Sequence, residues 1–166
     1  MKLILASIVA TVALTAVAPA WACIPPPVTD QWVEGQARSG PVAVGTVVRT
    51  SEIAEADCRR LVEGLQPFPP YLPVDDICRG RLGTADVRIE GRVAGEAAAK
   101  QTVNWGERLP CRAGFILNAG DRVAIFAVSE PVQSPLFGRL TARALPEDMA
   151  RAAPRLAAAF DGLEAR

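Results

Sequence analysis

The feature that most constrains the fold is a period-two alternation at 85–93, where small or apolar residues occupy the odd positions and charged residues the even ones. Because successive side chains of a strand point to opposite faces, this pattern is typical of a strand with one buried and one solvated face. It predicts that Arg88, Glu90 and Arg92 face solvent or line a groove. The inward residues predicted here and on a later strand are Val87, Ile89, Val93, Val123 and Ile125.

Four further segments also have strand patterns. The segment 42–49 is rich in valine on both faces, which predicts a strand buried on both sides. A short strand is expected at 100–105, another at 122–129 after a turn at 118–121, and a fifth at 137–145. Five short strands with one helical insertion favour a small closed barrel over a parallel sheet.

The segments between and after these strands differ in character. Ser51 can cap a helix that runs to Leu65, and prolines at 67, 69, 70 and 73 then prevent regular structure. Cys58 and Cys78 bracket this excursion, so 50–83 is interpreted as an insertion stapled at its base. Residues 31–39 predict a short helix or loop, and 146–166 a helical tail that Pro154 divides in two.

The N-terminus has the features of an export signal. Lys2 precedes an apolar run at 3–17, and 20–22 reads Ala-Trp-Ala, a small-x-small cleavage pattern. Cleavage after residue 22 makes Cys23 the first residue of the mature protein, whereas cleavage after Ala20 leaves Trp21 first. We therefore divide the chain into a signal peptide at 1–22, a domain at 23–145 and the tail at 146–166, and expect the protein to be secreted or periplasmic.

Composition narrows the function classes. The chain has 18 basic and 18 acidic residues, so no basic field favours nucleic-acid binding. Beyond the signal segment no apolar run is long enough for a membrane span. There is no histidine, which removes histidine-based triads and most zinc sites. We expect no catalytic residues, no metal site and no cofactor, and we interpret Asp75 and Asp76 as an exposed turn.

The cysteines point to an oxidising compartment. All four (Cys23, Cys58, Cys78 and Cys111) follow the signal segment, and an even count there indicates two disulfides. The residues alone leave three pairings open.

The order of the motifs resembles that of the netrin-like superfamily, and most closely the bacterial relatives of the tissue inhibitors of metalloproteinases. The resemblance is carried by the strands at 42–49 and 85–93, by Pro-Cys-Arg-Ala-Gly-Phe at 110–115, and by Gly-Asp-Arg at 120–122 followed by Val-Ala-Ile-Phe-Ala at 123–127. It implies a mainly β fold, a five-stranded OB-type Greek-key barrel with a helical insertion and a short C-terminal helical segment. It also implies the pairings Cys23–Cys111 and Cys58–Cys78.

The resemblance implies a function as well. In such inhibitors the amine and carbonyl of the N-terminal cysteine, here Cys23, chelate the catalytic zinc of a metalloprotease, and Ile24 enters the adjoining specificity pocket. Pro25 stands where the animal inhibitors carry a second cysteine, and their C-terminal domain is absent here. The partner is then a zinc metalloprotease or another exported protein. The alternatives are a non-inhibitory interaction domain with purely structural disulfides and an enzyme whose polar cluster the sequence does not reveal.

Overall fold

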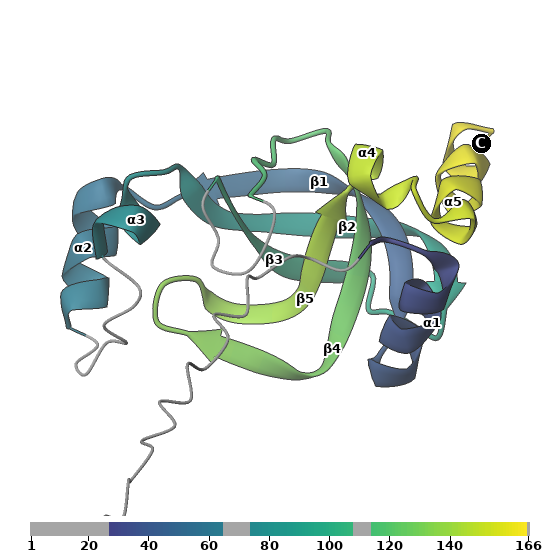
Figure 1. Cartoon of the computed structure of the whole chain (residues 1–166), viewed down its shortest axis with the longest axis horizontal. Helices are drawn as coiled ribbons and strands as arrows, with labels where there is room; N and C mark the ends of the chain where they lie inside the picture. The colour runs from purple at the N-terminus through teal and green to yellow at the C-terminus, as the bar shows by residue number, and fades with distance from the viewer. Residues whose placement is uncertain (1–26, 65–73, 108–113, 166) are drawn as a thin grey trace, which may run out of the picture.

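The computed structural model describes residues 27–64, 74–107 and 114–165, and within them the fold is mainly β, as predicted. Five antiparallel strands form one open sheet in the order β3-β2-β1-β4-β5 (Figure 1). The strands are β1 Val42–Glu52, β2 Leu82–Ala94, β3 Lys100–Gly106, β4 Arg122–Ser134 and β5 Gly138–Pro146.

Short helices lie at the two ends of this sheet (Figure 1). At one end are α1 Asp30–Ser39, α4 Glu147–Ala150 and α5 Pro154–Glu164, and at the other are α2 Glu55–Glu63 and α3 Val74–Cys78. Pro154 is the first residue of α5, where its missing N–H costs no helical hydrogen bond, so it divides the tail as predicted. In the described part of the chain, no helix has the length and apolar character that a membrane crossing needs.

The outermost strands β3 and β5 approach each other. The N–H of Thr102 on β3 donates to the hydroxyl of Thr141 on β5 at 2.9 Å, and that hydroxyl lies 3.4 Å from the carbonyl oxygen of Thr102. We call this line of approach the seam. At Thr102, therefore, the backbone of β3 bonds to the Thr141 side chain of β5 and not to the β5 backbone.

The main core lies on the face that the strands enclose. Val47, Val87, Val103, Trp105 and Ile125 are each at most 1 % exposed there. The Trp105 ring N–H donates to the carbonyl of Thr84 at 3.0 Å, which satisfies its one polar group.

A second core lies on the opposite face, where the helices cover β1 and β4. Val42 and Val44 pack there against Leu156 and Phe160 of α5 and Val33 of α1, all at most 1 % exposed. The first half of β1 is therefore buried on both faces, which confirms the expectation from its valine-rich pattern.

Some local predictions are wrong. Ser51 does not cap a helix, because β1 continues to Glu52 and Ser51 pairs with Thr84 of β2. The helix α2 begins at Glu55, after Ala54. Val48, predicted to be buried, is 44 % exposed.

The odd-numbered residues of 85–93 do not all face the same core, because the side of the sheet to which they point changes part of the way along β2. Val87 is buried and Ile89 packs against the main core, as do Val123 and Ile125 of β4. Register shifts then break the ladder between β1 and β2, and Val93 packs against the second core. Such a bulge reverses which residues face inward. Arg88 and Arg92 are exposed, as predicted.

Candidate functional site

The N-terminal site predicted from the sequence lies outside the described residues. Cys23, Ile24 and Pro25 precede Pro27, the first residue that the structure describes, and Pro27 is exposed. Cys111 also lies outside them. What the structure describes is the body to which these segments are joined.

The point where the N-terminal segment joins the body is fixed by several contacts. Val28 packs against the second core, and the Thr29 hydroxyl accepts a hydrogen bond from Trp32 N–H at 3.2 Å as the N-cap of α1. Asp30 accepts the backbone N–H of Arg155 at 3.0 Å, and Glu34 pairs with the Arg155 side chain at 3.1 Å. Residues 28–34 are thus tied to the first turn of α5.

The described residues on either side of the segment that contains Cys111 contact each other. Gly106 at the end of β3 and Phe115 exchange two backbone hydrogen bonds, of 3.0 Å and 2.8 Å. Phe115 is therefore held beside the end of β3.

The predicted disulfide Cys58–Cys78 is confirmed. It joins α2 to α3 across 20 residues, and both cysteines are buried with Val62 and Leu82. Half-buried Leu136 and Phe137, at the tip of the β4–β5 hairpin, pack against the same cluster. We call α2, α3 and this cluster the disulfide lobe.

A cleft of about 640 Å³ lies beside the residues that follow Cys111. Phe115, Ile116 and Met149 give it apolar walls, and Glu147 and Arg151 reach it from α4 and the turn after it. Asp121, Arg122 and Asp148 complete its charged rim.

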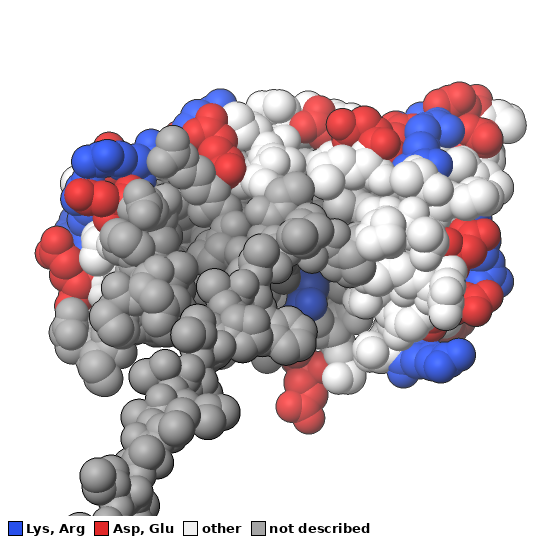
Figure 2. Space-filling view, viewed as in Figure 1, with Lys and Arg blue, Asp and Glu red and all other residues white. Residues whose placement is uncertain are grey.

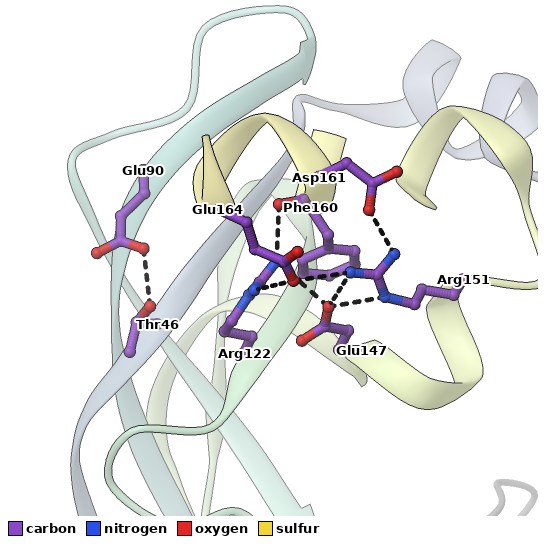
Figure 3. A network of polar contacts seen from close by, with 8 residues as sticks. All are labelled: Thr46, Glu90, Arg122, Glu147, Arg151, Phe160, Asp161 and Glu164. Carbon is purple, nitrogen blue, oxygen red and sulfur yellow. Dashed lines mark hydrogen bonds and ion pairs between the residues drawn. The ribbon is translucent and has the colours of Figure 1, made fainter. Parts of the chain in front are cut away.

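Two arginines join this rim to α5 through a charged network (Figure 3). Arg122 of β4 donates to the Phe160 carbonyl at 2.7 Å and pairs with Glu164 at 2.8 Å and Glu147 at 3.2 Å. Arg151 also pairs with Glu147 and Glu164, at 2.6 Å and 3.2 Å. We call this network the clasp, because it ties the start of β4 to α4 and α5.

The clasp surrounds an aromatic ring. The guanidinium carbons of Arg122 and Arg151 lie 5.2 Å and 5.6 Å from the Phe160 ring centre. Hydrogen bonds to Asp161 and then Glu147 raise the pKa of Arg151. The Nε of Arg122 is buried and has no hydrogen-bond partner among the described residues, so within them the clasp leaves one donor unused.

A second polar cluster lies on the solvent face of β2. Asp86, whose side chain is 11 % exposed, accepts from Arg49 at 2.7 Å, Lys100 at 3.1 Å and the Thr102 hydroxyl at 3.1 Å. Burial raises the pKa of Asp86, but hydrogen bonds from Lys100, Arg49 and Thr102 outweigh burial and hold the pKa below its usual value. The cluster links β1, β2 and β3 rather than presenting a free carboxylate.

Charged side chains on the face in Figure 2 are mixed in sign. Lys and Arg stand beside Asp and Glu over the disulfide lobe and around α5, and a largely uncharged surface lies beside the second group. This mixture offers no single-sign field to steer a charged polymer.

Asp75 and two of the tryptophans are engaged in structural contacts. Asp75 lies in the helix α3 and not in the predicted exposed turn; it pairs with Arg59 and with Arg79, and these arginines lower its pKa. Trp105 is buried, and Trp32 packs edge-on against Phe126 at 4.8 Å. Among the described residues no three His, Cys, Asp or Glu side chains are grouped to hold a metal ion.

A smaller cleft of about 260 Å³ opens along the seam, and sequence reasoning missed it. Asn104 of β3 and Arg143 of β5 form its polar rim, and Val128, Val132 and Leu140 contribute apolar lining. The alternation of Arg139, Thr141 and Arg143 was the only signal in the sequence. It predicts an outward face of β5 but not which strand lies opposite. We call this the seam cleft.

Comparison with protein-family models, with curated proteins and with solved structures finds no match to this chain.

Proposed function

We propose that this chain is an exported protein-binding module of the netrin-like type that contacts its partner through the N-terminal segment Cys23–Pro25. The observation that carries the proposal is the fixed root of that segment. Thr29 caps α1, Asp30 accepts the Arg155 N–H at 3.0 Å, and Val28 is packed against the second core. A segment that is joined to its fixed root through the consecutive prolines at 25–27 loses little conformational entropy on docking.

The strand arrangement supports an OB-type barrel as the body of this module. The sheet order β3-β2-β1-β4-β5 leaves β3 and β5 as the outer strands, and Thr102 and Thr141 join these across the seam. Closing the sheet along this line would make a five-stranded barrel with β1 next to both β2 and β4.

The cysteines support the same proposal. Cys58 and Cys78 are joined to each other, which leaves Cys23 and Cys111 to pair. Phe115, four residues after Cys111, is hydrogen-bonded to Gly106 at the end of β3, so a Cys23–Cys111 bond would tie the mature N-terminus to the sheet. With its side chain held in that bond, Cys23 would present its amine and carbonyl to a partner.

A zinc metalloprotease is the partner whose chemistry suits such an N-terminus. A catalytic zinc with three protein ligands keeps an open position, which an amine and a carbonyl oxygen from one residue can occupy. Ile24 would then occupy the neighbouring substrate pocket. The second candidate is a non-inhibitory interaction domain that uses the same segment without chelation.

The test begins with the exported protein. Intact mass and N-terminal sequencing should show Cys23 as the first residue and two disulfides, and non-reducing peptide mapping should recover Cys23 linked to Cys111. A mature chain that begins at Trp21 would exclude chelation by the Cys23 amine.

Chelation is then tested on inhibition of a panel of secreted zinc metalloproteases. One alanine added before Cys23 should abolish inhibition, because it moves the free amine away from the zinc. The matched control adds one alanine after Arg166, and both proteins should keep the same melting temperature. If inhibition survives the added N-terminal alanine, chelation by Cys23 is excluded and the non-inhibitory interaction domain is the remaining candidate. If partner binding survives removal of residues 23–26, binding through the N-terminal segment is excluded as well.

A further inference from the structure

The larger cleft, the one of about 640 Å³ that Phe115 lines, has the size of a binding site. Sites for small ligands measure roughly 300–1,000 Å³, so this cleft has room for more than one side chain. Phe115, Ile116 and Met149 line it and are half-buried, so each presents part of its apolar surface there. The uncharged part of an occupant can pack on these three side chains.

The charged rim of this cleft has an excess of carboxylates. Both guanidiniums of the clasp are already paired with the three carboxylates of that network (Figure 3). Asp121 and Asp148 line the cleft as well, and neither forms an ion pair with another described residue. Asp121 accepts the backbone N–H of Asn118 at 2.7 Å through one oxygen, which holds the carboxylate in place. The charge complementary to this part of the described chain is therefore positive.

An arginine side chain combines the two properties that suit this cleft. Its stem and its planar guanidinium pack on apolar and aromatic surfaces, and its several donors can bind two separate carboxylates. A guanidinium is also less strongly hydrated than the ammonium of lysine. Arginine therefore loses less hydration than lysine on entering a cleft with apolar walls.

The cleft is within reach of the proposed N-terminal contact. Gly114 lines it and is three residues after Cys111, so their Cα atoms are at most about 11 Å apart. A disulfide holds its two Cα atoms within about 7 Å. With Cys23 bonded to Cys111, the Cα of Cys23 would lie within about 18 Å of Gly114. A partner surface of standard size, about 800 Å² and roughly 30 Å across, would cover both.

We propose that the larger cleft receives an arginine side chain of the partner polypeptide that the N-terminal segment contacts. The guanidinium binds Asp121 and Asp148, and the stem packs against Phe115 and Met149. This inference rests on the proposed function, because the Cys23–Cys111 bond is what brings the cleft beside Cys23. If the partner is a zinc metalloprotease, its arginine lies on the rim of the active site that holds the zinc.

The test uses acetyl-Leu-Arg-Leu amide as the probe, titrated into the full mature protein labelled with ¹³C at the methionine methyl group. Met149 is the one methionine of the chain besides Met1, so a single resonance reports on the cleft. This resonance should shift saturably. The same peptide with citrulline, an uncharged analogue of arginine, should bind at least about tenfold more weakly. Equal affinity for the two peptides would overturn the proposal.

Two variants assign the effect to the rim. Asp148→Asn should weaken binding of the arginine peptide about fivefold, the contribution of one exposed charge pair, and should keep the melting temperature. The matched control is Glu130→Gln, an exposed carboxylate of β4 that does not line the cleft, and it should bind as the wild type does. Unchanged affinity in Asp148→Asn would refute the site, and ethylguanidinium binding as tightly as the peptide would show a site for small cations instead.

The link to the N-terminal segment is tested separately. In Lys100→Arg the mature chain has no lysine, so a nitroxide attached through an amine labels the N-terminus alone. The label should broaden the Met149 methyl resonance, and chemical reduction of the nitroxide should restore it. Peptide binding without broadening would separate the cleft from the N-terminal contact and overturn the shared partner. Broadening without peptide binding would overturn the arginine site and leave the proposed N-terminal contact intact.

Discussion

The two halves of β1 lie in different surroundings, although they belong to one continuous strand. From Val42 to Val47 the strand is covered by the main core on one face and by α1 and α5 on the other. From Val48 to Glu52 one face meets solvent, and the strand then enters the disulfide lobe, whose buried cluster is Cys58, Val62, Cys78 and Leu82. Packing on both faces stabilises the first half, whereas a covalent bond and exposed ion pairs stabilise the region beyond the second.

The largest effect is expected where β1 is covered on both faces. Phe160→Ala removes a fully buried ring between Arg122 and Arg151, and truncation of a buried phenylalanine costs about 3–5 kcal/mol. Val48→Ala, in the half-exposed part of the same strand, should cost less than about 1 kcal/mol. Urea unfolding followed by tryptophan fluorescence measures both, and similar losses would erase the contrast between the halves.

The next largest loss of stability is expected in the disulfide lobe. Replacing both Cys58 and Cys78 with serine should lower the free energy of opening α2 by about 3 kcal/mol, the chain-entropy value for a loop of this length. Amide hydrogen exchange in α2 should then become roughly a hundredfold faster. Exchange at Val44 and Val123 should stay unchanged, because these residues belong to the other two cores. Global unfolding of the variant would show that the lobe is part of the main core.

The clasp should contribute less to the free energy of unfolding than the Phe160 ring or the Cys58–Cys78 disulfide does. Arg122→Met keeps the apolar stem against Phe160 but leaves the Phe160 carbonyl without its 2.7 Å donor, at a cost of about 1–3 kcal/mol. Arg60→Met in the lobe is the control, because this arginine is 77 % exposed and its ion pair should contribute less than about 1 kcal/mol. Unfolding at low and high salt should show a larger salt effect on wild type than on Arg122→Met. Equal losses in the two variants would mean that the clasp is only another surface ion pair.

The sequence predicts this contrast in part. Val42, Val44 and Val47 indicated a strand buried on both faces because apolar residues fall on both parities, a local property. Val48 was predicted to be buried, but its exposure depends on how far the covering helices extend along β1. Ser51 was predicted to cap a helix, but it pairs with Thr84 of β2. The residues next to Val48 and Ser51 in the sequence indicate neither of these contacts. Val93 packs against the second core and not the main core, because a bulge interrupts the pairing of β1 with β2. The regular alternation in the sequence does not indicate that bulge.

The candidate sites differ in the same way. The pair Cys58–Cys78 was predicted from the family resemblance and from the two cysteines bracketing one excursion, and the structure confirms it. The role of Cys23 stays a prediction, since it lies outside the described residues. The seam cleft could not be predicted, because it depends on β3 lying opposite β5, where the contacting residues Thr102 and Thr141 are 39 positions apart in the chain. No pattern within either strand specifies that pairing.

The smallest loss of stability is expected from substituting Asp86. This residue lies on the solvent face of β2, beside Arg49 in the second half of β1. Arg49 and Lys100 are 75 % and 61 % exposed, so screening limits the contribution of the cluster, and Asp86→Asn should cost about 1 kcal/mol at pH 7. A carboxyl whose pKa in the folded state lies below its unfolded value of 3.8 stabilises the protein above that value, and the contribution disappears as the pH falls through the folded pKa. The stability of wild type and Asp86→Asn, measured by urea unfolding from pH 7 downward, should therefore converge below pH 3.8. The control is Asp148→Asn, which changes an exposed carboxyl that forms no ion pair with another described residue, and it should alter the stability at pH 7 by less than about 0.5 kcal/mol. A difference at Asp86 that persisted unchanged into acid would mean that its hydrogen bonds, and not its charge, stabilise this half of the strand.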